Sequence, residues 1–414
     1  MNAVDARCLA RVRGLLCALL CRLLLAVCLF MPAWPATAQM SGGMDEIARG
    51  LAGLAPIPGM VSFSGPRFKL YADQVDKSWQ HYQEKIGQPM QQWGEREIPA
   101  VADAQLFYPF SGPDFLSASQ LRPQAKRYVL IANQRAGQPV DPANLNLGEA
   151  QRLFAMYSEA WEKFGQLGFF LTNDLMRNNA RVGMHINPTG ILMAFAARRG
   201  LVVDAVTPIR VRENGSDVEA PAATPKADWS SVRLSLRRGG EAVLLDYVYM
   251  DLSDAALNKN PAELAFIRQQ AQHPVMFKAA SHLPQGVGFG HIRQAVLAAS
   301  PLIIQDETGI EYSLLAKSYQ VQLYGRFSKP HHLFFSTQQV ALAKAYQDST
   351  STRPLTFRVG YEKASGSSMQ IAARGEAATH AARTPAQSKA PAVAESKAAR
   401  PNPSKEILAT TPPL

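Results

Sequence analysis

The chain has 414 residues, of which 47% are hydrophobic and 18% are charged, a composition typical of a globular protein with a sizeable core. Its formal net charge of +10 lies mainly at the two ends, because residues 1–38 contribute +3 and residues 363–414 contribute +4, which leaves +3 for the middle. That middle has no basic stripe with interleaved aromatic residues, so we expect no nucleic-acid partner.

The first 38 residues have the layout of a secretory signal peptide. A basic start with Arg7, Arg11 and Arg13 precedes an apolar run over residues 15–30, and residues 36–38 (Ala-Thr-Ala) form a small-x-small cleavage site. We therefore expect cleavage after residue 38 and a periplasmic or secreted protein.

A retained membrane anchor and a lipid anchor are the two other interpretations of this segment. A retained membrane anchor normally needs about 20 uninterrupted apolar residues, and Arg22 interrupts this run. A lipid anchor would need a small residue before its acceptor cysteine, but Val27 precedes Cys28. After cleavage, no transmembrane segment is expected in the remaining sequence.

All the cysteines of the chain lie within this leader, at Cys8, Cys17, Cys21 and Cys28. A mature chain that starts at Gln39 would be free of cysteine. Disulfides, cysteine nucleophiles and thiolate zinc sites would then be excluded.

The stretch from residue 67 to 362 alternates apolar runs with helical patterns, which predicts a single α/β domain. The hairpin is the clearest local signal, with glycines in the turn at residues 238–241. Three times an apolar strand ends in an acidic turn that leads through a helix to another strand, as parallel pairing requires. The expected fold is a mixed, partly parallel sheet flanked by helices, with one clear β-hairpin. Helices are predicted over residues 76–90, 147–165, 192–199, 261–272, 292–299 and 337–346, and strands over 105–110, 128–132, 201–211, 231–236, 242–250, 275–279, 302–305 and 318–327.

The two flanks of this domain are expected to lack a core. Residues 39–66 are rich in glycine and proline around a short amphipathic candidate helix at residues 44–54, and predict a flexible lead-in. Residues 363–414 are rich in Ala, Pro and Lys with few large apolar side chains, so they predict a disordered tail. A basic tether to an anionic envelope polymer is the alternative function for that tail.

The most distinctive string is Tyr-Pro-Phe-Ser-Gly-Pro-Asp-Phe over residues 108–115. If residues 107–110 form a strand, Ser111 and Asp114 follow its carboxyl end, where open α/β sheets hold ligands. Both are candidate catalytic residues. Asp114 could equally be a helix cap, since Ser, Gly, Pro and Asp are common in turns and at caps. Ser111 does not stand in the Gly-x-Ser-x-Gly motif of serine hydrolases.

This string resembles the hallmark of a family of uncharacterised secreted or lipid-anchored bacterial proteins. Residues 277–283 and 303–310 are also similar to that family, and the resemblance spans residues 76–346. The family pattern has a second aspartate where this chain has Glu307, and a proline where it has Glu311. The resemblance implies an exported protein but no known activity.

A second candidate site runs from Ser281 and His282 through a glycine-rich loop with Gly288 to a helix start with His291 and Arg293. Bare backbone N–H groups at a helix start, together with an arginine, can bind an anion. The alternative is an ordinary flexible loop with its cap. The glycine spacing departs from the dinucleotide-binding fingerprint, and no cofactor is predicted.

Asp306 and Glu307 form a carboxylate pair at the end of another predicted strand. Such pairs can act as acid and base or bind a hard cation, but they also simply close turns. His185 has no second histidine at metal-ligand spacing, and His331-His332 cannot easily direct both rings at one ion, so no metal site is predicted.

Two functional hypotheses follow from these candidates. In the first, the protein binds a small or polymeric envelope ligand in a cleft at the carboxyl ends of the strands, through Ser281, Gly288, His291, Arg293 and Glu307. In the second, it is an exported hydrolase or transferase with the catalytic residues Ser111, Asp114, His282 and Asp306 at the same rim. The sequence leaves the oligomeric state open.

Overall fold

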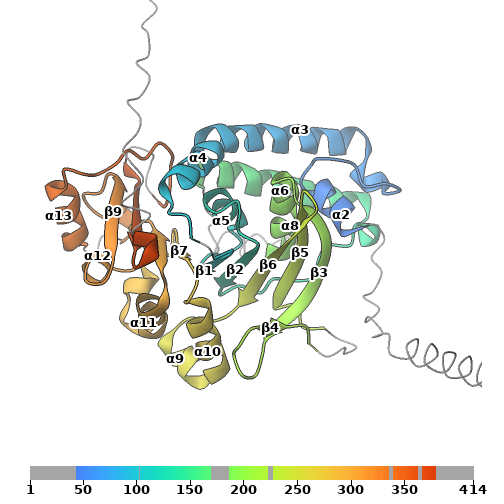
Figure 1. Cartoon of the computed structure of the whole chain (residues 1–414). Coiled ribbons are helices and arrows are strands. Elements are labelled where there is room, and N and C mark those ends of the chain that lie inside the picture. The colour runs from blue at the N-terminus through green and yellow to red at the C-terminus, as the bar shows by residue number, and fades with distance from the viewer. Residues whose placement is uncertain are drawn as a thin grey trace, which may run out of the picture.

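One mixed sheet runs through the molecule, and every described strand belongs to it (Figure 1). The strand order is β4-β3-β5-β6-β2-β1-β7-β8-β10-β9. The computed structural model describes residues 43–101, 103–168, 186–221, 227–334, 339–361 and 366–378. The strands are β1 (Gln105–Pro109), β2 (Arg127–Ala132), β3 (Val202–Val211), β4 (Val218–Glu219), β5 (Ser231–Arg238), β6 (Glu241–Tyr249), β7 (Val275–Phe277), β8 (Leu302–Gln305), β9 (Gln320–Gly325) and β10 (Ser368–Ala373).

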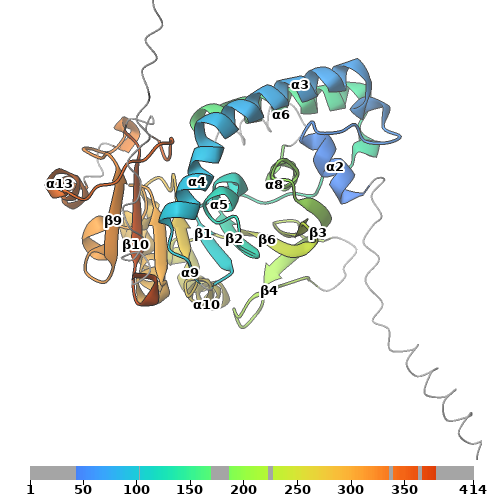
Figure 2. The ribbon, with the colours of Figure 1, turned by 45° about the horizontal axis from the view of Figure 1, so that its top comes forward.

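Helices cover both faces of the sheet. α2 to α8 lie on one face and α9 to α11 on the other (Figure 1), and Figure 2 shows α3 and α6 side by side above α8. The helices are α2 (Met44–Leu51), α3 (Gly65–Tyr82), α4 (Gln88–Glu97), α5 (Phe115–Leu121), α6 (Leu147–Leu167), α8 (Pro188–Arg198), α9 (Asp254–Lys259), α10 (Pro261–Gln270), α11 (Gly290–Ala299), α12 (Tyr312–Leu315) and α13 (Val340–Asp348).

The centre of the sheet is parallel. β6, β2, β1, β7 and β8 are neighbours in that order, and each adjacent pair runs in the same direction. Side chains alternate between two cores: Leu106 and Tyr108 pack toward α2–α8, whereas Phe107 packs toward α9–α11. Both faces of these strands are buried, which explains their continuous apolar sequence.

Antiparallel strands complete the sheet at both sides. β5 and β6 form the hairpin, with Gly239 and Gly240 at positive φ in its turn, and β3 pairs with β5. On the other side β10 lies between β8 and β9 and is antiparallel to both. The fold is thus the α/β fold with a mixed sheet, flanking helices and a β-hairpin that the sequence predicted.

The amphipathic helix predicted at residues 44–54 is confirmed as α2, but the flexible lead-in around it is wrong for the part that the structure describes. Ile47 and Leu51 of α2 are buried in the main core, and the Asp45 carboxylate accepts a hydrogen bond of 3.0 Å from the Val203 amide of β3. Arg198 of α8 donates to the Ala52 carbonyl at 2.7 Å. The burial of an apolar helix face offsets the ordering cost that the glycine- and proline-rich surroundings suggested.

The predicted boundary of the disordered tail is also wrong. Residues 368–373 form β10, and all of them are buried. Backbone pairing to a strand on each side, together with the burial of Met369 and Ile371 in the main core, offsets the cost of ordering this segment. Residues 379–414, like the predicted signal peptide, lie outside the described residues. Among the described helices, none has the length and apolar character needed to cross a bilayer.

Candidate functional site

Three polar turns meet where β1, β7 and β8 end, and we call them the carboxyl edge: residues 110–114, 278–282 and 306–308. The strands are parallel neighbours, so their carboxyl ends lie at one side of the sheet (Figure 1). Hydrogen bonds join the last two turns: the Ala279 amide donates to the Asp306 carboxylate and the Ala280 amide to the Thr308 hydroxyl, each at 2.7 Å.

Asp114 has three hydrogen-bond partners. It caps α5, because its Oδ1 accepts a hydrogen bond from the Ser117 amide at 3.1 Å. Its Oδ2 accepts from Lys278 Nζ at 2.7 Å and from the Tyr108 hydroxyl at 3.2 Å. Asp114 and Lys278 are both 2% exposed. The cap predicted from the sequence is present, and the carboxylate is also the counter-ion of a buried lysine.

Lys278 is a site residue that the sequence analysis missed. Its ammonium donates to the Gly168 carbonyl at 2.6 Å as well as to Asp114, and its own carbonyl accepts from Tyr108 at 3.2 Å. Burial, followed by the nearby Asp114 charge, raises the pKa of the Tyr108 phenol well above its usual value. A lysine directly after the buried strand Val275–Phe277 was the available signal, since a buried ammonium needs a counter-ion.

Ser111 joins β1 to β2. Both its amide, at 3.0 Å, and its hydroxyl, at 3.2 Å, donate to the Ile131 carbonyl. Within the described part of the chain, no histidine or carboxylate hydrogen bonds to this hydroxyl. The arrangement of nucleophile and base that a serine enzyme needs is therefore not formed by these residues.

Asp306 and Glu307 face the interior. Asp306 is fully buried, and it accepts hydrogen bonds from the Ala279 amide at 2.7 Å and the Thr308 amide at 2.9 Å. Glu307 is 1% exposed and accepts from the Ser368 hydroxyl of β10 at 3.0 Å. Burial is the main effect on the Asp306 carboxyl and raises its pKa.

Gly360 closes the space beside this carboxylate pair. It has φ +67°, and a Cβ built there would lie 2.7 Å from Asp306 Oδ2. A hard cation would need several oxygen ligands and open space. In the described residues no group of three or more histidine, cysteine, aspartate or glutamate side chains is placed to bind a metal.

Ser281 and His282 lie at the outer part of the carboxyl edge. The Ser281 hydroxyl is exposed and lies 2.8 Å from the Tyr361 hydroxyl. His282 is 5% exposed, with Nδ1 3.2 Å from Gln285 Oε1 and its ring 5.1 Å from that of Phe334. Nε2 of His282 is buried and has no hydrogen-bond partner among the described residues.

The predicted anion site at the start of α11 is wrong, because the chain itself occupies it. The Gly290 and His291 amides donate to the Asp254 carboxylate at 2.8 and 2.7 Å. The Arg293 guanidinium donates to the Pro284 and Gly286 carbonyls at 2.7 and 3.0 Å. An internal carboxylate therefore neutralises the helix terminus that an external anion would need.

Gly288 and His291 are the remaining candidates of that loop, and the Phe289 ring between them has its centroid 5.6 Å from that of Phe110. Gly288 is exposed, with open space around it. Nε2 of the His291 ring donates a 2.7 Å hydrogen bond to Asn258 Oδ1. Of the other histidines considered, His185 lies outside the described residues, and His331 stacks near His332 with ring centroids 4.0 Å apart.

Backbone strain is concentrated at the carboxyl edge. Among the described residues, the non-glycine residues with positive φ are Phe110 (59°), Ala279 (49°), Ser281 (53°) and His282 (59°). All of them follow β1 or β7. The left-handed conformation costs roughly 1–2 kcal/mol for a residue with a Cβ, so it persists only where the surroundings enforce it. Sequence patterns carry no signal for this feature, because none of these residues is a glycine.

Comparison of the chain with protein-family models, with curated proteins and with solved structures gives no match.

We predict that Lys278→Met lowers the free energy of unfolding by about 3–5 kcal/mol, because it leaves the Asp114 charge buried and unpaired. The double substitution Lys278→Met/Asp114→Asn should recover part of this loss. Lys69→Met is the control, since Lys69 pairs with Asp73 at 2.8 Å on the surface. Urea denaturation gives the free energy of unfolding of all three variants. Equal effects of Lys278→Met and Lys69→Met would contradict the buried pair.

Burial lowers the pKa of His282, so the native state favours the neutral ring. Its stabilising contribution is fully present above the unfolded-state pKa of about 6.5 and is lost as the pH falls through the lower native pKa. We therefore expect wild type to lose stability faster than His282→Asn between pH 7.5 and pH 5.5, values that bracket that pKa. Asparagine tolerates the left-handed backbone and does not titrate. If the free energies of unfolding of wild type and His282→Asn differ by the same amount at every pH, the His282 ring is solvated and this prediction is wrong.

Proposed function

We propose that the protein is an exported binding protein of the cell envelope, which holds a small or polymeric ligand at the carboxyl edge. The observation that carries this proposal is the clustering of left-handed, non-glycine residues after β1 and β7. Strain of this kind accumulates where a fixed geometry is needed for a ligand.

The connections of these strands support the same location. β1 leads to α5, which packs on the face of α2–α8, whereas β7 leads to α11 on the opposite face. β1 and β7 are neighbours, so their outgoing loops diverge. In open α/β sheets, ligands bind outside the carboxyl ends of strands at such a switch point.

The accessible groups at this edge favour a ligand that presents hydroxyl groups beside apolar faces. Ser281 and Tyr361 offer hydroxyl groups, and burial raises the pKa of the Tyr361 phenol to about 12, so it stays protonated. The centroids of the Phe334 and Tyr361 rings lie 4.8 Å apart. The buried Nε2 of His282 adds one unsatisfied polar atom, and such atoms call for a specific partner.

Export rests on the leader sequence. The basic start, apolar run and cleavage site over residues 1–38 support secretion or transfer to the periplasm. The absence of cysteine after residue 28 is compatible with an oxidising compartment. An envelope polymer or a small envelope molecule is accordingly the proposed ligand class.

The alternative, an exported hydrolase or transferase, is disfavoured by the surroundings of Ser111. Its hydroxyl donates to the Ile131 carbonyl, and Asp114 is committed to Lys278 and the α5 cap. Catalysis through these groups would require their rearrangement.

Ala279→Gly tests the strain on which the proposal rests. Glycine adopts positive φ without the Cβ penalty, so we expect stability to rise by up to about 1 kcal/mol. Ala295→Gly in α11 is the matched control and should lower stability by about 1 kcal/mol, because glycine is unfavourable within a helix. Chemical denaturation gives both values. Equal destabilisation by the two variants would remove the argument from strain.

A thermal-shift screen of the purified protein tests binding itself, with soluble peptidoglycan fragments and N-acetylglucosamine oligomers as probes. A ligand present at 100 times its Kd should add about 2.7 kcal/mol of stability. Ser281→Ala should weaken a ligand at the carboxyl edge about three- to tenfold, through the loss of one hydrogen bond. Ser216→Ala, at an exposed serine in the β3–β4 loop, should leave the affinity unchanged.

Equal affinities of the Ser281→Ala and Ser216→Ala variants would place the ligand elsewhere. Labelling with a fluorophosphonate distinguishes the alternative function. We expect no modification of Ser111, and covalent labelling of that residue would favour the hydrolase.

A further inference from the structure

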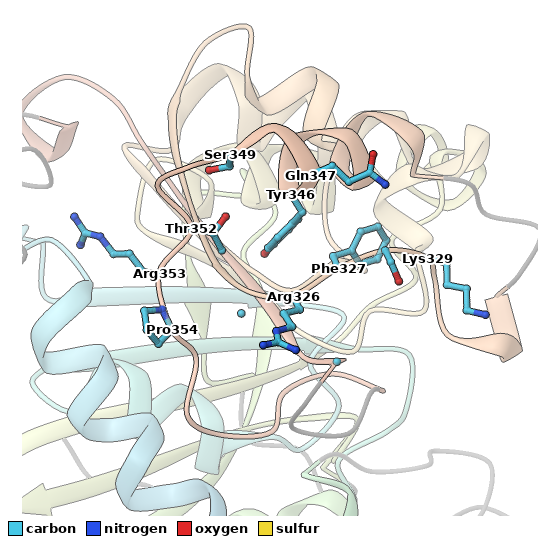
Figure 3. Close-up of a pocket in the computed structure, with 12 residues that line it drawn as sticks. Arg326, Phe327, Lys329, Tyr346, Gln347, Ser349, Thr352, Arg353 and Pro354 are labelled. Atoms are coloured by element: carbon cyan, nitrogen blue, oxygen red, sulfur yellow. The ribbon is translucent and has the colours of Figure 1, made fainter. Parts of the chain in front are cut away.

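A pocket of about 780 Å³ lies at the outer end of the sheet, beyond β9 (Figure 3). Its volume is in the range of small-molecule sites. None of the residues that line it belongs to the carboxyl edge, and β10 lies between β8 and β9. The pocket is lined by Gly325, Arg326, Phe327, Ser328, Lys329, Tyr346, Gln347, Ser349, Thr352, Arg353, Pro354 and Gly366.

The lining carries uncompensated positive charge. It includes Arg326, Lys329 and Arg353 but no aspartate or glutamate. Arg353 is neutralised by the Glu97 carboxylate of α4 at 2.8 Å, and in Figure 3 it points away from the other lining side chains. Arg326 and Lys329 are exposed and form no ion pair within the described part of the chain.

One polar atom of the pocket has no partner. The Thr352 hydroxyl oxygen is buried and makes no hydrogen bond to any described residue. In Figure 3 the Arg326 side chain extends below Thr352 and Tyr346. A guanidinium and a hydroxyl donor thus border the same space, and both suit an anionic oxygen acceptor.

The pocket also has an aromatic wall. The rings of Phe327 and Tyr346 lie 6.2 Å apart, and the Tyr346 hydroxyl donates to the Tyr324 carbonyl of β9 at 2.8 Å. That hydrogen bond fixes the ring in place. An organic group attached to the anion would find an ordered apolar surface beside the charges.

We propose that this pocket is a second binding site, for a phosphate ester with a small apolar or ring substituent. Arg326 binds two phosphate oxygens through its planar guanidinium, which matches phosphate geometry better than an ammonium does. Lys329 adds a second positive charge at the rim, Thr352 donates one hydrogen bond, and the substituent packs against Phe327. The site is independent of a ligand at the carboxyl edge.

Isothermal titration of phenyl phosphate into the purified protein tests this site. Saturable one-to-one binding is expected, and Arg326→Gln/Lys329→Gln should weaken it by about tenfold or more, as for hydrogen bonds to charged groups. Lys259→Gln/Arg268→Gln removes the same charge from exposed positions on α9 and α10 and should change the affinity less than about twofold, because distant exposed charges are screened. Phenol, without the phosphate, should not bind.

Thr352→Val separates a role in binding from one in folding. The substitution removes a buried hydroxyl without a partner and keeps the side-chain shape, so the melting temperature should not fall. Affinity for phenyl phosphate should fall by about threefold or more. The proposal is overturned by the absence of saturable binding, by equal weakening in both charge variants, or by unchanged affinity in Thr352→Val.

Discussion

The buried pairing of Lys278 with Asp114 is the interaction on which the carboxyl edge depends. Both charged groups are buried away from water, so each needs the other as its counter-ion. The Tyr108 hydroxyl contacts both the Asp114 carboxylate and the Lys278 carbonyl. The ends of β1 and β7 are therefore held together, and the left-handed residues that follow them cannot relax independently.

Local signals in the sequence were sufficient for most of the sheet. The apolar run before Ser111 is β1, the run at residues 128–132 is β2, and residues 302–305 are β8 with the predicted bounds. The hairpin was readable because its turn requires two glycines between alternating strands. Each of these elements is specified by its own residues, so no distant partner had to be known.

β10 could not be predicted in this way, and neither could the position of α2 in the core. The sequence of β10, Ser-Met-Gln-Ile-Ala-Ala, lies in an alanine-rich region, and its alternation of polar and apolar residues covers only the first four positions. Its stability comes from β8 and β9, which no local pattern reports. α2 is short, and its place depends on α8 and β3, more than a hundred residues away along the chain.

The same limit applies to the candidate site. The strand ends indicated which turns would lie at the same edge of the sheet. They did not indicate which polar groups would bind other groups of the same chain. The lysine that binds Asp114 is 164 residues distant, and Asp254 reaches the start of α11 from 36 residues earlier. A glycine-rich helix start followed by Arg293 looks like an anion site in sequence, and only the tertiary structure reveals the carboxylate that fills it.

The insertion of β10 between β8 and β9 has a consequence for how the protein matures. Synthesis produces β9 more than forty residues before its neighbour, so two strand edges stay unpaired until the final part of the domain has emerged. Unpaired edges are sites where chains aggregate. Completion of the sheet is therefore delayed until residues 368–373 have been made, and β10 closes the assembly by pairing with both open strand edges.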